Sequence, residues 1–141
     1  MNDEDALLRA AVVAWNAGRW QAAHEGFEEL WRAASLGRSA HGGHSGDAHE
    51  ADARAEAALL AGDPRPELWR ALAQAAAVGV LKRQGRANGA RAVASKAAAR
   101  LRALRDEHGP VIARVDVDLA AANLAQCVED AGRLGALRLF D

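Results

Sequence analysis

Several kinds of residue are scarce in this 141-residue chain, and each scarcity excludes a class of protein. A single Cys means that no disulfide can form within the chain, which excludes a disulfide-stabilised scaffold. Nine Val and one Ile are too few for a fold dominated by β-sheet. Three Pro exclude a Pro-rich chain, and Tyr is absent. The longest nearly apolar run, residues 71–81, is about half as long as a membrane-spanning helix.

Alanine and leucine, in contrast, are abundant. The chain has 37 Ala and 16 Leu, and its hydrophobic content of 50% is too high for a disordered protein. A chain of this length is normally one domain and buries about 70% of the surface that its unfolded form exposes. We therefore expect residues 1–141 to form a single all-α domain, a compact bundle of four to five helices with antiparallel helical hairpins.

Apolar residues recur every three or four positions in five segments, which is the spacing that gives a helix one apolar face. The predicted helices begin near residues 2, 20, 67, 88 and 119 and end near residues 17, 36, 84, 105 and 131. Gly18 suits the left-handed end of the first helix, and Asp118 is the predicted N-cap of the last. The third helix is apolar nearly all round, so we expect it to be central. Residues 111–117 alternate weakly, which is typical of an extended segment.

Residues 36–64 are predicted to be a mobile insertion rich in Gly and His. Residues 37–50 contain almost no large apolar side chain that could contribute to a core. His41, His44 and His49 could collect a divalent metal, but a site on such a loop loses ordering entropy when it binds. We interpret these histidines as adventitious metal ligands.

One polar pair lies beside an aromatic cluster on the second predicted helix. On a helical wheel, His24 falls about 60° from the centre of the aromatic face and Glu28 about 100° from it, while Glu25 and Glu29 point outward. His24 and Glu28 are one turn apart, so they could act as an acid/base couple or as two metal ligands. A local hydrogen bond that satisfies a half-buried imidazole is the alternative. Gln74 interrupts the apolar third helix and needs a partner, either from the second helix or from a backbone carbonyl.

The two metal-site motifs that this helix approaches are both incomplete. His24-Glu25 begins like the zinc motif H-E-x-x-H, but position 28 is Glu. The di-iron motif needs Glu three residues before His24, where this chain has Gln21. A divalent metal held by His24, Glu28 and a residue of another helix stays open as a hypothesis.

The net charge is −1, but residues 82–105 carry eight basic and no acidic side chains. This helix could bind RNA or an acidic partner. Its cations, however, flank the apolar stripe as in a solvated helix, and no aromatic is interleaved to stack on bases, which disfavours nucleic acid. The first residues have no basic start followed by an apolar run, so we expect a cytoplasmic protein that does not engage a membrane.

Four segments of the chain resemble a known family. Residues 15–20 (WNAGRW) and 23–32 (AHEGFEELWR) are similar to the signature of domain of unknown function family 309, and residues 72–90 and 115–117 resemble its later blocks. This chain has Gln21-Ala22 where the family usually has Glu, and Val80-Leu81 where it has aromatic residues or His. The family is a compact all-α fold without an established activity. The resemblance implies one polar pocket formed by His24, Glu25, Glu28, Trp31, Gln74 and Asp116.

We expect from these features a binding or regulatory module whose polar pocket holds an unidentified small ligand and whose surface mediates self-association. The alternative is a metal-dependent or acid/base enzyme of hydrolase type, with His24 and Glu28 as the candidate catalytic residues. A second alternative is an RNA-associated protein that uses residues 82–105. Cys127 lies on an apolar helix face and is predicted to be a buried structural thiol.

Overall fold

The computed structural model describes residues 3–35, 62–129 and 134–140, which are mostly helical. Its helices are α1 (Asp3–Asn16), α2 (Trp20–Ser35), α4 (Arg65–Arg83), α5 (Ala87–His108) and α6 (Val117–Glu129). Two short strands, β1 (Val111–Ile112) and β2 (Val115–Asp116), separate α5 from α6. The prediction of an all-α bundle is confirmed.

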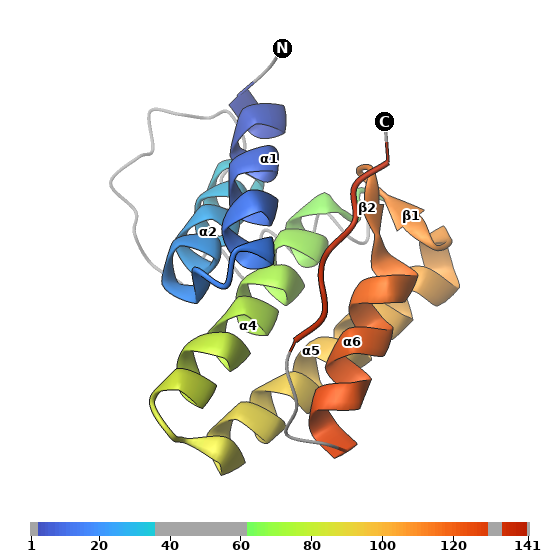
Figure 1. The fold of residues 1–141 in the computed structure, drawn as a ribbon. Helices are drawn as coiled ribbons and strands as arrows, with labels where there is room; N and C mark the ends of the chain where they lie inside the picture. The colour runs from blue at the N-terminus through green and yellow to red at the C-terminus, as the bar shows by residue number, and fades with distance from the viewer. Residues whose placement is uncertain (1–2, 36–61, 130–133, 141) are drawn as a thin grey trace.

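Helix α4 is the centre of the bundle, as its apolar sequence predicts. It packs against α2 on one side and α5 on the other, while α1 covers α2 and α6 covers α5 (Figure 1). Most of its residues are buried, and many of them are alanines. Small side chains let the neighbouring helices approach closely, and the large side chains of Trp15, Phe27, Trp69 and Leu72 fill the remaining core.

The helix ends follow local signals in the sequence. Asp3, Glu4 and Asp5 occupy the first turn of α1, where the helix dipole favours negative charge. The turn between α1 and α2 passes through Gly18, whose φ of +76° is in the left-handed region. Residues 111–117 form a hairpin rather than one extended segment, and its turn residues Ala113 and Arg114 both have positive φ.

The prediction that Asp118 caps the last helix is wrong. α6 begins at Val117, and the carboxylate of Asp116 accepts the hydrogen bond from the backbone N–H of Leu119 at 2.9 Å. Asp118 instead pairs with Arg105, whose guanidinium lies 2.8 Å from its carboxylate. Strand β2 runs directly into α6, so Asp116, the last residue of the strand, is also the residue that caps the helix.

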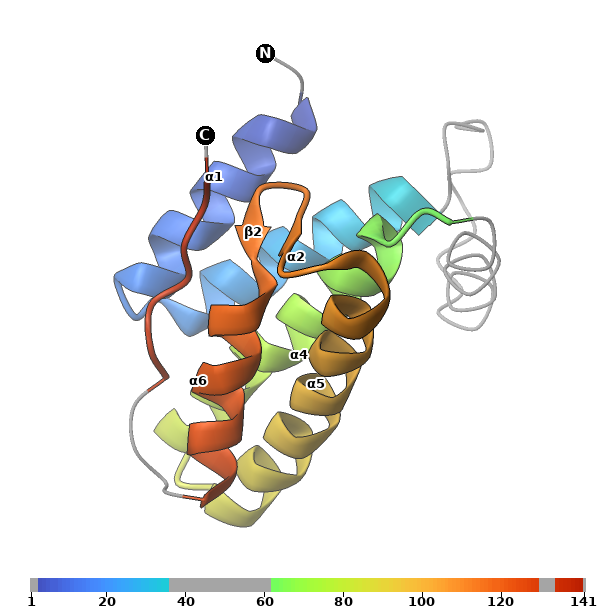
Figure 2. The same cartoon turned by 90° about the vertical axis from the view of Figure 1, so that its right-hand side faces the viewer.

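The C-terminal segment (residues 134–140) is extended and lies along the bundle between α1 and α6 (Figure 1, Figure 2). Val115 of β2 bridges to Leu139 of this segment in antiparallel fashion. The indole N–H of Trp15 donates to the carbonyl of Gly135 at 2.8 Å, and the side-chain amide of Asn123 in α6 donates to that of Ala136 at 3.0 Å. The segment therefore joins the first helix to the last.

Most of the predicted insertion at 36–64, including His41, His44 and His49, lies outside the described residues. The same holds for residues 130–133. Among the helices that the structure describes, none combines the length and the hydropathy of a membrane span.

Candidate functional site

His24 is held against α4 through one ring nitrogen. Its Nδ1 lies 2.8 Å from the carbonyl oxygen of Ala73, and because a carbonyl only accepts, Nδ1 carries the proton. The other nitrogen, Nε2, faces the carboxylate of Glu28 at 3.5 Å. The side chains of His24 and Glu28 are 26% and 36% exposed, so the pair is half-buried and within reach of solvent.

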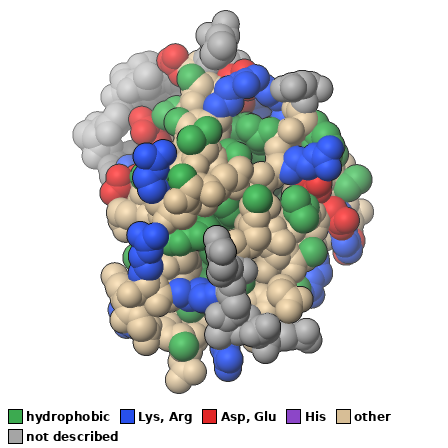
Figure 3. Space-filling view, in the orientation of Figure 1, with side chains coloured by type: hydrophobic (Ala, Val, Ile, Leu, Met, Phe, Trp, Pro, Cys, Tyr) green, Lys and Arg blue, Asp and Glu red, His purple; other side chains and the backbone are tan. Residues whose placement is uncertain are grey.

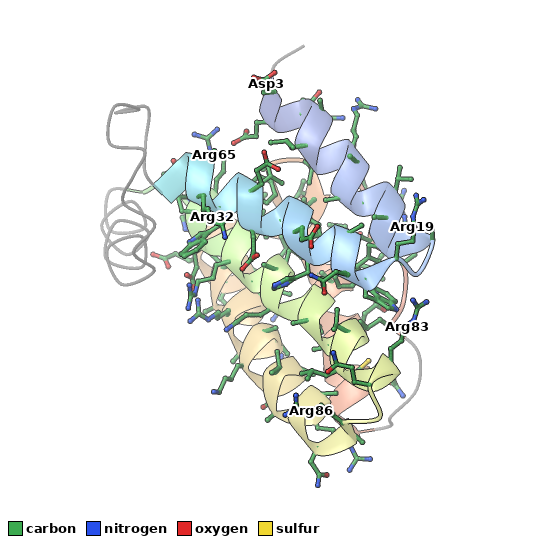
Figure 4. All side chains as sticks on the ribbon, turned by 90° about the vertical axis from the view of Figure 1, so that its left-hand side faces the viewer. Asp3, Arg19, Arg32, Arg65, Arg83 and Arg86 are labelled. Carbon is green, nitrogen blue, oxygen red and sulfur yellow. The ribbon has the colours of Figure 1, made fainter. Side chains whose placement is uncertain are left out.

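Glu25, another residue of the predicted pocket, is more exposed than the pair. Glu25 points outward, as the wheel predicted, and accepts a hydrogen bond from Gln21 at 3.0 Å. The second oxygen of Glu28 lies 3.9 Å from the guanidinium of Arg32, which is mostly exposed. Figure 4 shows α2 lying across α4, with Arg32 at its outer surface. Glu28 is therefore the acidic residue of this helix that stays beside His24.

Gln74 and Trp31 each have a buried polar atom without a hydrogen-bond partner among the described residues. These atoms are Oε1 of Gln74 and Nε1 of Trp31. Gln74 directly follows Ala73, whose carbonyl receives His24. The ring of Trp31 is covered by the guanidinium of Arg70 at 5.0 Å, one turn before Gln74. Buried polar atoms of this kind call for a water, an ion or a ligand.

Asp116 lies apart from these residues. Its carboxylate caps α6, and its backbone N–H donates to the carbonyl of Arg138 in the C-terminal segment. In the described part of the chain, no three side chains of His, Cys, Asp or Glu come together in a way that could hold a metal ion. The structure thus brings His24 and Glu28 together beside α4 and gives Asp116 a separate structural role.

A cleft that the sequence analysis did not anticipate opens beside the turn between α1 and α2. Its volume is about 700 Å³. Its walls come from the end of α1 and the following turn, the start of α2, the end of α4 and the C-terminal segment; they are Trp15, Asn16, Ala17, Gly18, Trp20, Gly79, Lys82, Arg83, Leu134, Gly135 and Ala136. His24 and Glu28 do not line it.

The cleft combines aromatic rings with positive charge. The rings of Trp15 and Trp20 meet edge to face, with centroids 5.2 Å apart. Lys82 and Arg83 are the charged side chains among its described lining residues, and no carboxylate accompanies them. A guanidinium nitrogen of Arg83 donates to the carbonyl of Gly18 at 2.9 Å, which fixes the group at the rim; Figure 4 places Arg83 beside the end of α4.

The sequence did not predict this cleft, because its walls come from segments that lie far apart in the sequence. The C-terminal segment, for which the sequence predicted no helix, supplies one whole wall. A smaller cavity of about 200 Å³ adjoins Lys82 and is lined in part by Cys127, which is buried as predicted.

Part of the positive charge of helix α5 is paired with carboxylates of the same chain. Arg100 contacts both carboxylate oxygens of Glu67 at 3.0 and 3.1 Å. Hydrogen bonds to Asp118 and Asp106 raise the pKa of Arg105 above its ordinary value. On the face seen in Figure 3, Lys and Arg side chains are scattered rather than gathered into one patch. The RNA hypothesis stays a prediction.

Comparisons with family models, with curated proteins and with solved structures found no match for this chain. The resemblance to domain of unknown function family 309 accordingly stays a prediction.

Proposed function

We propose that the protein is a binding module and that its ligand-binding site is the cleft beside Trp20. The observation that carries this proposal is the pairing of two cations, Lys82 and Arg83, with two indole rings in a cleft whose described walls hold no carboxylate. Clefts of this size suit small molecules, and a few well-placed polar groups fix the orientation of the ligand. The corresponding ligand is a small anion with a flat apolar body.

The positions of the two cations support an anionic ligand. Both side chains lie in the last turn of α4, where they also offset the negative end of the helix dipole. Arg83 uses one nitrogen for the carbonyl of Gly18, so its planar group keeps further donors for an oxyanion. Among the described residues, Lys82 has no carboxylate partner. The local charge is therefore positive although the whole chain carries −1.

The first test titrates the protein with the aromatic sulfonate 8-anilinonaphthalene-1-sulfonate and follows its fluorescence. Saturable binding is expected, weaker at high salt because the ionic contact is exposed. Arg83→Gln is expected to raise the Kd about tenfold, as the loss of a charge-assisted hydrogen bond does.

The matched control is Arg86→Gln. Arg86 is an exposed cation three residues away that does not line the cleft, so its loss should leave the Kd unchanged. Ala136→Phe provides a second arm, because Ala136 is exposed and lines the cleft, and a ring there would fill it. Equal weakening by Arg86→Gln, or full binding to Ala136→Phe, would contradict the proposed site.

Membership of domain of unknown function family 309 is a companion proposal. It is supported by residues 15–20 and 23–32, which have identifiable roles in the fold. Trp15 and Asn16 hold the C-terminal segment, and Gly18 makes the left-handed turn. Gly26 packs on α1, where a Cβ atom would lie 3.0 Å from that of Ala11.

The enzyme alternative, with His24 and Glu28 as acid/base pair, has support in their 3.5 Å separation.

A further inference from the structure

The smaller cavity beside Lys82 lies at the end of the bundle where α4 turns into α5 (Figure 1). Its volume is about 200 Å³. Side chains from the end of α4, the start of α5 and the end of α6 line it, so three helices contribute its walls. Neither the proposed cleft nor the pair of His24 and Glu28 includes these walls, apart from Lys82, which the cavity shares with the cleft.

The inner wall of this cavity is apolar. It is formed by Val78, Ala90 and Cys127, which are 1%, 3% and 3% exposed. An apolar cavity of about 150 Å³ is large enough for benzene, so this one has room for a hydrocarbon group of about six carbon atoms. A water molecule against such a wall finds few hydrogen-bond partners, which makes an apolar group the better occupant.

Two cations line the same cavity on its solvent side. Lys82 is half-buried and Arg91 is exposed, so both side chains can reach a ligand that enters from the solvent. Among the described residues, neither has a carboxylate partner. No carboxylate lines the cavity in the described part of the chain either. Positive charge beside an apolar wall is the complement of an amphiphilic anion.

We propose that this cavity binds a short aliphatic carboxylate of about six carbon atoms. The hydrocarbon chain lies against Val78, Ala90 and Cys127, and the carboxylate contacts Lys82 and Arg91. The planar guanidinium of Arg91 can donate to both oxygens of a carboxylate. The ligand class differs from the flat aromatic anion proposed for the cleft, because this cavity is smaller than the 300–1,000 Å³ of sites for larger ligands.

The test titrates the protein with sodium hexanoate in a calorimeter, and saturable binding is expected. Hexan-1-ol has the same chain without the charge, and it should bind at least about tenfold more weakly because the charge-assisted hydrogen bonds are lost. Butanoate keeps the charge but has two methylene groups fewer. It should also bind about tenfold more weakly, because less apolar surface is buried.

Two substitutions in α5 address the two halves of the cavity. Arg91→Gln is expected to raise the Kd for hexanoate about tenfold through loss of the charge. Ala87 is exposed and lines the cavity, so the ring of Ala87→Phe should occupy it and raise the Kd at least about tenfold without changing the core. The matched controls are Arg102→Gln and Ala92→Phe, at exposed positions of the same helix that do not line the cavity; both should leave the Kd unchanged.

Amide chemical shifts in nuclear magnetic resonance spectra locate the bound hexanoate. The amides of Ala90 and Cys127 should shift on titration, whereas those of Gly18 and Gly135 in the cleft should keep their positions. Ala136→Phe, which fills the cleft, should bind hexanoate as its parent does.

Three results would overturn the proposal. They are no saturable binding of hexanoate, binding of hexan-1-ol as tight as that of hexanoate, and unchanged affinity in both Arg91→Gln and Ala87→Phe. Loss of hexanoate binding in Ala136→Phe would place the carboxylate in the cleft and would equally contradict a separate site. The cleft is tested with a different probe and with Arg83, which does not line the cavity, so either site can fail without the other.

Discussion

Gly79 and Trp20 show how a single atom sets the distance between two helices. A Cβ atom at Gly79 would clash with Cδ2 of the Trp20 ring, because it would lie closer to that atom than real Cβ atoms come to their neighbours. The absence of that atom lets the indole lie directly against α4, where it forms a wall of the proposed cleft. Gly79 is therefore a packing residue, although a glycine inside a helix costs backbone entropy.

Gly79→Ala is expected to lower the free energy of unfolding by about 1–3 kcal/mol, because the extra methyl overpacks the contact with Trp20. Urea denaturation at equilibrium measures the change. The control is Gly89→Ala in the first turn of α5, where the nearest side-chain atom would be 3.9 Å away. There the same substitution should stabilise by up to about 1 kcal/mol through helix propensity. Destabilisation of equal size at both positions would contradict this account.

At the scale of single residues, the sequence predicted what depends on one helix and missed what depends on how two helices cross. The wheel placed His24 and Glu28 side by side and Glu25 and Glu29 outside, as the structure has them. It could not reveal that the carbonyl of Ala73 receives His24, because that contact depends on how α2 crosses α4.

At the scale of elements, one amide side chain makes two hydrogen bonds to the C-terminal segment. Asn16 donates to the carbonyl of Leu137 at 3.2 Å and accepts from its backbone N–H at 2.9 Å. These are the two backbone contacts that a residue of a neighbouring β-strand would make with Leu137. Here the side chain of Asn16 makes them at the end of α1. The segment carries Leu137, which is buried, and it supplies a wall of the cleft.

Asn16→Ala is expected to lower the free energy of unfolding by about 1–2 kcal/mol. Two hydrogen bonds are lost, and the backbone groups of Leu137 must bind water instead. Hydrogen exchange at the amide of Leu137 measures it locally, and protection there should fall more than in α4. Asn123→Ala, which removes one bond to the carbonyl of Ala136, is the comparison and should leave the Leu137 amide protected. Unchanged exchange in Asn16→Ala would show that the segment is held by other contacts.

The helices themselves were predictable because each carries its own periodicity and its own end signals. α4 and α5 begin and end within three residues of the expected positions. The hairpin and the C-terminal segment were not predictable in the same way. Ala113 and Arg114 adopt positive φ, which their residue types do not favour, and the segment pairs with β2 only after the bundle has formed.

At the scale of the whole molecule, ion pairs connect elements that are distant in sequence. Arg65 at the start of α4 contacts Asp63 at 3.2 Å and Glu4 of α1 at 3.3 Å (Figure 4 labels Arg65). Burial raises the pKa of Asp63, but hydrogen bonds and charge from Arg65 outweigh it and bring that pKa below its ordinary value. Arg114 likewise binds Asp5 of α1.

A carboxylate whose pKa is lowered in the folded state stabilises the protein at pH values above its unfolded-state pKa. This stabilisation is lost as the pH falls through the folded-state pKa. Asp63→Asn should therefore lower stability at pH 7 by about 0.5 kcal/mol, a small value because the pair is on the surface. The difference should shrink as the pH falls towards the lowered folded-state pKa and vanish below it, where the carboxyl is protonated in both states. Urea denaturation at pH 7 and at a series of acid pH values measures it, with Glu107→Gln as an exposed control. A difference that persists in acid would assign the effect to packing.

The hydrogen bonds from Trp15 and Asn16 to the C-terminal segment join residues that are 120 and 121 positions apart in the sequence. The helical pairs of the bundle, in contrast, join neighbours along the chain. During synthesis the first helix must therefore wait, with its indole N–H and side-chain amide still hydrated, until residues 135–137 have left the ribosome. The walls of the cleft are incomplete before that moment, so a nascent chain acquires its proposed binding site last.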